Sequence, residues 1–187
     1  MVFNSVAEVF DSIEQTRSRI YEHVKGLSEE QSRFRPADDQ WCVVEIAEHL
    51  SVTESRVLKL IQSLVENGEA TAAPVGTDTV IAPISLESIA AEIPAKATAP
   101  EFLQPTGKLS LEEVIQSLEQ TRQSLVALKP RLQAKDFTPV IFSHESFGTF
   151  TTYQLVAFIG HHEDRHLGQI AALVASESFP ARQAAGA

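Results

Sequence analysis

Two histidines in the last third of the chain have the type and spacing of metal ligands. His162 and His166 lie four residues apart, and in a helix this spacing places two side chains one turn apart and about 40° apart around the axis. Both imidazoles can therefore bind one ion. They also continue an apolar stripe that includes Ile159 and Leu173, where a buried imidazole would need partners for both ring nitrogens. We interpret the pair as metal ligands rather than as hydrogen-bonded core histidines.

The same segment contains an H-E-x-x-H motif, which is the zinc signature of many metalloproteases. An extended protease motif would need glycine and histidine at the positions that Gln169 and Ala172 occupy. The other protease form takes its third ligand from a downstream glutamate. Only Glu177 follows His166, and at about 1.5 Å per residue it lies roughly 16 Å away along the same helix. A metalloprotease is therefore the less favoured alternative.

A third ligand is then expected from upstream, and His49 is the residue best placed to supply it. It lies beside the apolar stripe of another predicted helix, so it can point toward the bundle axis and complete a set of three neutral ligands. His161 lies about 100° from His162 around the helix, and we expect it to flank the site or to face solvent. His23 is expected at the surface, and His144, in a loop, is a weak candidate for a ligand.

Four segments of the chain have the apolar periodicity of amphipathic helices. They span residues 5–27, 41–67, 110–130 and 152–175. This pattern predicts an all-α fold, a four-helix bundle with a long crossover between helices two and three. The crossover, residues 69–109, contains five prolines, and we expect a short helical turn near residues 86–93. The segment FTPVIF is the only β-like candidate, and Pro139 weakens it.

Composition limits the class of protein further. We expect a single domain over residues 1–187, with a frayed tail from about residue 178. The formal net charge of −10 argues against nucleic acid as a partner, since phosphate binding needs clustered Lys and Arg. The one cysteine, Cys42, excludes an intrachain disulfide. No stretch has the roughly 20 apolar residues of a membrane span, and the first residues lack the features of a secretory signal. We therefore expect a cytoplasmic protein that does not bind membranes.

Two motifs in this order resemble those of the DinB-like (DinB/YfiT) superfamily, whose members are regarded as metalloenzymes. The first is QWCVVEIAEHL, and the second is SFGTFTTYQLVAFIGHHEDRHLGQI. The residues that carry the resemblance are Trp41, Glu45, His49 and Leu50, followed by His162, His166, Gln169 and Ile170. The resemblance spans nearly the whole chain. One departure is Cys42, which stands where the family often has serine or threonine and is a poorer helix N-cap.

The resemblance implies a four-helix bundle with one divalent metal bound by His49, His162 and His166. Some relatives transfer low-molecular-weight thiols onto small molecules or isomerise them with the help of a thiol. Three neutral ligands would leave the ion its full charge and open positions for water or a thiol. Zinc and nickel are the metals that we favour, and iron and copper also suit histidine ligands. The expected partner is a small-molecule substrate together with a low-molecular-weight thiol, and a homodimer is an open alternative to a monomer.

The leading functional prediction is thus a metal-dependent enzyme with transferase or hydrolase-like chemistry. Glu45, one turn before His49, is a weak candidate for orienting that ligand. We assign no catalytic residue, and we interpret Glu48, Glu163 and Asp164 as solvated helix charges rather than as acid–base groups. The alternative from another class is a non-catalytic bundle in which the metal is structural or the surface binds a partner.

Overall fold

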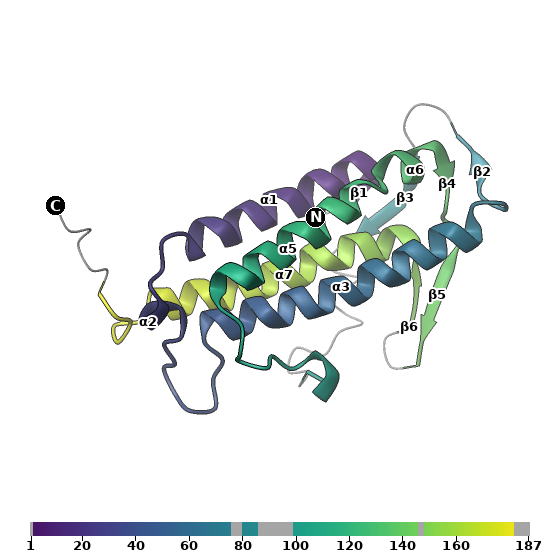
Figure 1. Cartoon of the computed structure of the whole chain (residues 1–187). Helices are drawn as coiled ribbons and strands as arrows, with labels where there is room; N and C mark the ends of the chain where they lie inside the picture. Colours follow the sequence, from purple (N-terminus) through teal and green to yellow (C-terminus); the bar gives the residue numbers. More distant parts are fainter. Residues whose placement is uncertain (1, 76–79, 86–98, 146–147, 182–187) are drawn as a thin grey trace.

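Four long helices lie side by side and form a bundle in the computed structural model, which describes residues 2–75, 80–85, 99–145 and 148–181 (Figure 1). The four are α1 (Val6–Val24), α3 (Val43–Gly68), α5 (Leu111–Val126) and α7 (Thr152–Val174). Helix α7 packs against both α1 and α3, and α3 also packs against α5. The predicted four-helix bundle is therefore confirmed, with helix bounds close to those expected from the sequence.

Three of the four long helices begin after a residue whose side chain satisfies a free backbone N–H group of the first turn. Ser5, Ser110 and Thr151 accept hydrogen bonds from the third residue beyond them, and the last two form capping boxes. The short helix α2 (Glu29–Ser32) starts with a capping box formed by Ser28 and Gln31. These caps explain why the helix starts could be placed within one or two residues.

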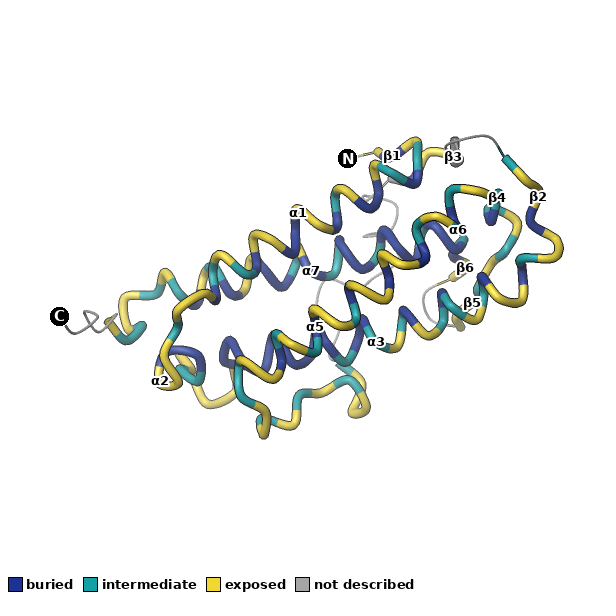
Figure 2. Tube along the Cα trace, turned by 45° about the horizontal axis from the view of Figure 1, so that its top comes forward, coloured by how far each residue is buried: buried dark blue, intermediate teal, exposed yellow. Residues whose placement is uncertain are grey.

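Apolar residues recur along the inward faces of the helices and form the core, as Figure 2 shows by burial. One cluster of buried side chains lies around Phe10, Phe137 and Tyr153, and a second lies around Ile20 and Ile170. Helices α1 and α7 approach closely at Gly160. A Cβ atom there would lie 2.7 Å from the Ile13 side chain, so this contact requires a glycine.

Three short antiparallel β-sheets of two strands each supplement the helices within the described residues. The pairs are β1 (Val2–Ser5) with β3 (Val80–Ser85), β2 (Ala73–Pro74) with β4 (Lys135–Asp136), and β5 (Ile141–His144) with β6 (Gly148–Thr151). The expectation of a single β-like segment was therefore wrong. The one candidate, FTPVIF, forms strand only from Ile141 onward, after Pro139, because proline cannot donate to a β-ladder.

The crossover between α3 and α5 is as long as the sequence predicted, and its described part contains short elements of secondary structure. It contributes β2 and β3 to the small sheets and ends in the 3-10 helix η1 (Glu101–Leu103). The expected helical turn near residues 86–93 lies outside the described residues. The link between α5 and α7 contains the short helix α6 (Lys129–Ala134) and the β5–β6 hairpin.

The start of the C-terminal tail is held against α2 instead of fraying from residue 178. Phe179 packs edge to face against Phe34, with ring centroids 5.6 Å apart. Gln31 donates a hydrogen bond of 3.0 Å to the carbonyl of Pro180. The remainder of the predicted frayed tail, residues 182–187, lies outside the described residues.

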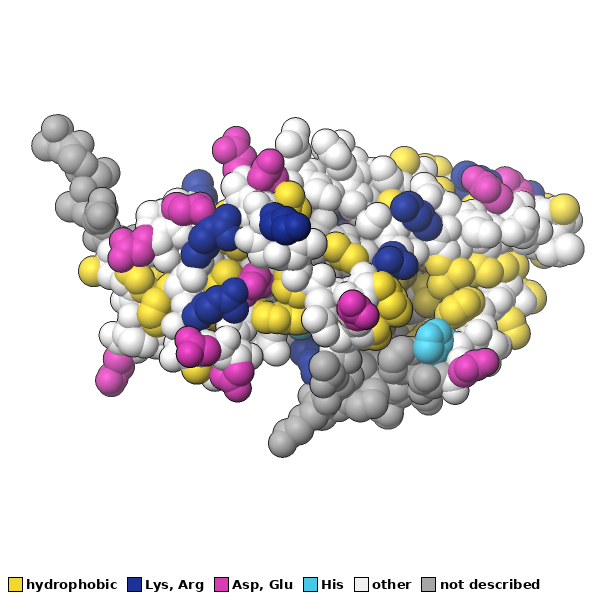
Figure 3. Space-filling model, turned by 60° about the horizontal axis from the view of Figure 1, so that its bottom comes forward, with side chains coloured by type: hydrophobic (Ala, Val, Ile, Leu, Met, Phe, Trp, Pro, Cys, Tyr) yellow, Lys and Arg dark blue, Asp and Glu magenta, His cyan; other side chains and the backbone are white. Residues whose placement is uncertain are grey.

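The surface carries charges of both signs. On the face in Figure 3, acidic and basic side chains are interspersed over the part of the molecule that the structure describes. None of the helices in the described ranges is both long enough and apolar enough to cross a membrane.

Candidate metal centre

Three histidines from two helices converge at one point between α3 and α7. His49 comes from α3, and His162 and His166 come from successive turns of α7. One ring nitrogen from each lies within 4.8 Å of the other two, and the Nε2 atoms of His49 and His162 are 3.2 Å apart. The structure therefore brings together the three residues that the sequence singled out.

The spacing of these nitrogens fits a metal site. With metal–nitrogen bonds of about 2.1 Å, two ligands of a tetrahedral ion are separated by about 3.4 Å. The 3.2 Å between His49 and His162 is close to that value. The three ring centroids lie 4.6 to 5.1 Å apart, so no backbone movement is needed to bring the nitrogens around one ion.

Two of the three rings are held by carbonyl oxygens that fix their tautomers. The Nδ1 atom of His49 lies 2.8 Å from the backbone carbonyl of Leu103, and that of His166 lies 2.7 Å from the side-chain carbonyl of Gln169. A carbonyl oxygen only accepts hydrogen bonds, so each Nδ1 must carry the proton. Each Nε2 is then unprotonated, and its lone pair is directed at the point where the three histidines converge. Ligand histidines are normally oriented in this way.

Burial keeps all three imidazoles neutral near pH 7. It lowers the pKa of His49 below the ordinary value, and it lowers the pKa of His166 to about 4. The pKa of His162 falls well below 6.5, first because of burial and then because the other two histidines lie beside it. A neutral imidazole is the form that binds a metal ion, so the site does not need to lose protons before binding.

The remaining histidines lie outside this group, as the sequence predicted. His161 is half-buried on α7 but does not share the group of converging nitrogens among the described residues. The Nδ1 atom of His23 lies 2.9 Å from the backbone carbonyl of Arg19 near the end of α1. His144 is exposed on β5.

The predicted role of Glu45 as the partner of His49 was wrong. Its carboxylate accepts a 3.0 Å hydrogen bond from the backbone N–H of Cys42 and forms an ion pair with Arg35. Burial acts to raise the pKa of Glu45, but the Cys42 N–H and the Arg35 guanidinium outweigh it and hold the pKa below its ordinary value. Glu45 therefore stabilises the start of α3, where the cysteine is a poor cap, and the Leu103 carbonyl orients His49 instead.

Glu48 is a buried anchor for the crossover and not a solvated charge, which corrects our interpretation. The residue is only 2% exposed to solvent. Its carboxylate accepts hydrogen bonds from the backbone N–H and hydroxyl of Thr106, at 2.9 and 2.6 Å, and from the Gly107 N–H at 3.0 Å. These bonds tie the end of the crossover to α3 a few residues after Leu103, the residue that holds His49.

Replacing Glu48 by alanine is therefore expected to weaken metal binding. Without the carboxylate the crossover loses its attachment to α3 beside the Leu103 carbonyl, and loss of such outer contacts lowers metal affinity by roughly 10-fold or more. Titration with cobalt, followed by its visible absorption, measures the change. Glu66→Ala, an exposed position on the same helix, is the matched control. Equal cobalt affinities of Glu48→Ala and the native protein would show that the anchor does not act on the site.

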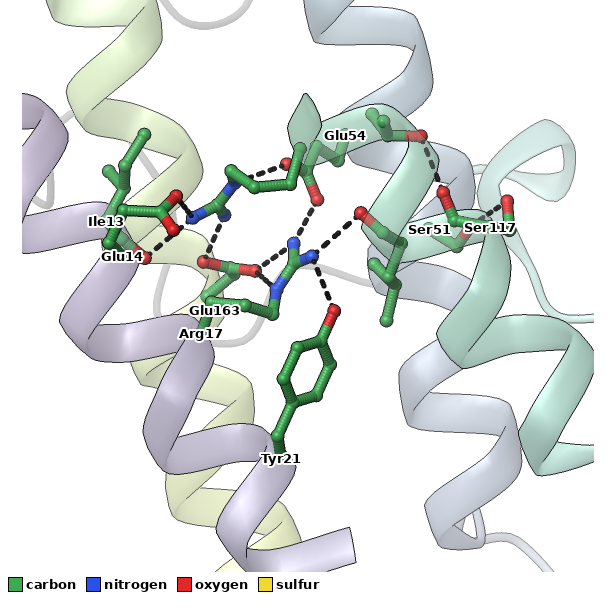
Figure 4. A network of polar contacts seen from close by, with 11 residues as sticks. Ile13, Glu14, Arg17, Tyr21, Ser51, Glu54, Ser117 and Glu163 are labelled. Atoms are coloured by element: carbon green, nitrogen blue, oxygen red, sulfur yellow. Dashed lines mark hydrogen bonds and ion pairs between the residues drawn. The ribbon is translucent and has the colours of Figure 1, made fainter. Parts of the chain in front are cut away.

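Glu163 is also buried, contrary to our interpretation of it as a solvated charge. It accepts a 2.6 Å hydrogen bond from Arg17 Nε and a 2.9 Å bond from Arg122 Nη2. Glu54 pairs with the same two arginines from the opposite side, and Figure 4 shows Glu54 and Glu163 facing Arg17. By contrast, Asp164 is exposed and pairs with Arg19 at the surface, as expected.

The buried quartet, Arg17, Glu54, Arg122 and Glu163, joins all four long helices. Its two positive and two negative charges cancel, and further N–H groups of the arginines donate to the backbone carbonyls of Leu118 and Ile13 at 2.9 and 2.7 Å. In an H-E-x-x-H protease the glutamate acts as general base beside the metal. The oxygens of Glu163 are instead bound to two arginines, which further disfavours the protease alternative.

A groove of about 550 Å³ is lined by Trp41 and Gln169, among other residues. Two of its lining residues contact the candidate ligands directly. The Trp41 ring packs against the ring of His49 at a centroid distance of 5.1 Å, and Gln169 is the partner of His166. Its volume is in the range of small-molecule sites.

The sequence of this chain is similar to those of known proteins. Residues 12–170 match the model of the DinB superfamily. The chain is 30% identical over 157 residues to YuaE of Bacillus subtilis (strain 168), described as an uncharacterized protein, and the alignment covers 83% of this chain and 91% of that relative. No solved structure gives a significant match. The family match covers most of the chain and includes all three converging histidines, and the chain therefore belongs to the DinB superfamily.

Proposed function

We propose that this protein binds one divalent transition metal through His49, His162 and His166 and is a metal-dependent enzyme acting on a small molecule. The observation that carries the proposal is the convergence of three imidazoles, of which His49 and His166 are buried and have their Nδ1 protons fixed by carbonyl groups. Three neutral ligands suit zinc or nickel best, and iron or copper would also fit.

A divalent ion held in this way supplies a positive charge that lowers the pKa of a bound water or thiol and so provides a nucleophile near neutral pH. The protein itself holds the rings. The Leu103 carbonyl, anchored through Glu48, orients His49, and Gln169 orients His166. The groove beside Trp41 and Gln169 offers room for a substrate. A low-molecular-weight thiol is the co-substrate that we favour, in a transferase or hydrolase-like reaction.

The first test of the proposal is the metal content of two neighbouring histidine variants. We expect His162→Ala to lose the metal and His161→Ala to retain it, because only the first belongs to the converging group. Protein purified without a metal-affinity tag is compared by elemental analysis. The two residues are adjacent and of the same type, so each serves as the control for the other. Equal metal contents in the two variants would contradict the assignment of His162.

A structural role for the metal is the second candidate, since an ion at this position would join α3 to α7. Cobalt-substituted protein distinguishes the two functions. If the ion has an open position, a low-molecular-weight thiol adds a sulfur-to-cobalt absorption band, and a screen of that thiol with small electrophiles then follows, with His162→Ala as the inactive control. A cobalt spectrum that no thiol or other small ligand changes would favour the structural role.

A further inference from the structure

The imidazole of His162 differs from the other two candidate ligands in what holds it. Leu103 and Gln169 accept the Nδ1–H groups of His49 and His166. The Nε2 atom of His162 faces the Nε2 atom of His49, so its Nδ1 is the nitrogen that needs a partner. No protein group among the described residues forms a hydrogen bond with it. Ligand histidines almost always donate this second N–H to a carboxylate, a carbonyl or water.

A small cavity lies beside His162 between α3 and α7. Its volume is about 10 Å³, and Thr53, Glu54, Phe158 and Glu163 are among the residues that line it together with His162. One ordered water needs about this much room and two to four polar partners. Because the carboxylates of Glu54 and Glu163 are already paired with Arg17 and Arg122, Thr53 and His162 are the polar lining residues that remain available to a water.

The Thr53 hydroxyl is the second, independent observation. Thr53 is one turn after His49 on α3 and only 7% exposed. Its Oγ1 atom is buried and has no hydrogen-bond partner among the described residues. A buried hydroxyl without a partner is unfavourable, and in a helix a threonine hydroxyl can usually bond to the carbonyl one turn back. Thr53 instead lines the same cavity as His162.

We propose that Thr53 is a positioning residue for His162 and acts through one water buried in this cavity. The water accepts the Nδ1–H of His162 and donates to the Thr53 hydroxyl. It fixes the tautomer of His162 in the way that Leu103 and Gln169 fix those of the other two rings, and it leaves Nε2 free to bind. This inference rests on the proposed metal site.

The test compares Thr53→Val, which removes the hydroxyl at nearly constant shape, with Thr53→Ser, which keeps it. Cobalt is the probe, and both its dissociation constant and its visible spectrum are measured. We expect Thr53→Val to weaken cobalt binding by about 10-fold and to shift the visible bands, as loss of such a partner does at other sites. Thr53→Ser should restore both. A purely structural hydroxyl would change the melting temperature of the metal-free protein but not the cobalt spectrum.

The outcomes separate this inference from the metal proposal. If the native protein binds cobalt, His166→Ala does not, and Thr53→Val behaves as the native protein does, then the role of Thr53 is refuted and the metal site stands. If the native protein binds cobalt no better than His166→Ala, the metal proposal fails and this inference fails with it. Melting of the metal-free variants, followed by circular dichroism, shows whether each variant is folded. If Thr53→Val does not fold, Thr53→Ser serves as the folded variant for comparison.

Discussion

Removing the metal ion is expected to lower the melting temperature of the protein by roughly 5–10 °C at neutral pH. A ligand that binds only the native state, at about 100 times its Kd, adds roughly 2.7 kcal/mol to the free energy of unfolding. For a chain of this size each kcal/mol shifts the melting temperature by about 2–4 °C. The ion would connect α3 to α7 through three imidazoles that otherwise lie close together in the bundle.

The pH dependence of this effect follows from the pKa values of the ligands. Burial lowers the pKa of His49 and His162 and brings that of His166 to about 4, from 6.5. Below pH 6.5 the unfolded chain takes up protons that the native protein does not, so the stability of the metal-free protein falls as the pH drops from 6.5 toward 4. Above 6.5 these groups contribute no pH dependence. Because the native rings stay neutral, the metal effect should persist at pH 6 and fade only near pH 4.

Thermal unfolding of the metal-free protein, with and without added zinc, measures both effects when it is repeated at about pH 7.5, 6 and 4.5. His49→Ala is the control, and its melting temperature should hardly respond to zinc at any of these values. Comparing metal-free with zinc-loaded protein avoids the pH dependence of a chelator. Identical melting curves for the two forms at neutral pH, when elemental analysis finds bound zinc, would mean that the ion is not coupled to the fold.

Replacing Glu163 by alanine is expected to lower the free energy of unfolding by about 3–5 kcal/mol, the usual consequence of breaking a buried ion pair. The side chain is 2% exposed and bonded to both arginines of the buried quartet. Burial acts to lower the pKa of Arg17, but its pairs with Glu163 and Glu54 outweigh this and raise the pKa. Both arginines therefore stay charged, and the variant leaves them with only Glu54 inside the core.

Urea denaturation of the metal-free proteins measures this loss without interference from the metal site. Asp164→Ala is the matched control, because the neighbouring residue pairs with Arg19 and both side chains are more than half exposed. Exposed pairs of this kind contribute about 0–1 kcal/mol, so we expect the control to be nearly as stable as the native protein. A loss below about 1 kcal/mol for Glu163→Ala would contradict the structural importance of the quartet.

The helices and the three histidines could be predicted because both depend on local sequence. An apolar stripe, a serine or threonine before it and a glutamate or glutamine three residues later define a helix start wherever they occur. His162 and His166 were noticeable because they interrupt such a stripe. The pairing with His49 followed from the need for a third ligand and from the family resemblance.

The partners of these histidines could not be predicted in the same way. The group that orients His49 is the backbone carbonyl of Leu103, and a carbonyl has no side-chain signature in a sequence. The position of this carbonyl depends on how the crossover returns to α3. Glu48 determines that return by its contact with Thr106, which lies 58 residues later in the chain. Gln169 did carry a signal, since it lies three residues after His166 on the same stripe. The short β-strands were missed because their pairing is long-range and their alternation is too brief to recognise.

The buried quartet was missed although its sequence signal resembles that of the histidines. Arg17 lies four residues after Ile13, and Arg122 lies four residues after Leu118, each on the inward face of its helix. Arginine is seldom fully buried, and these two positions were not considered as core residues. Charged residues of opposite sign on the inward faces of different helices are better interpreted as candidates for pairing with one another.

The positions of the three candidate ligands along the chain also bear on how the protein folds. His162 and His166 are one helical turn apart, whereas His49 is 113 residues away from His162. A forming α7 helix can offer two ligands before any tertiary structure exists, but the third ligand arrives only when the large loop between residues 49 and 162 closes, which is a slow and entropically unfavourable step. Tight metal binding would therefore mark the docking of α3 onto α7 during folding, and metal captured by the local pair alone would be held weakly until that step is complete.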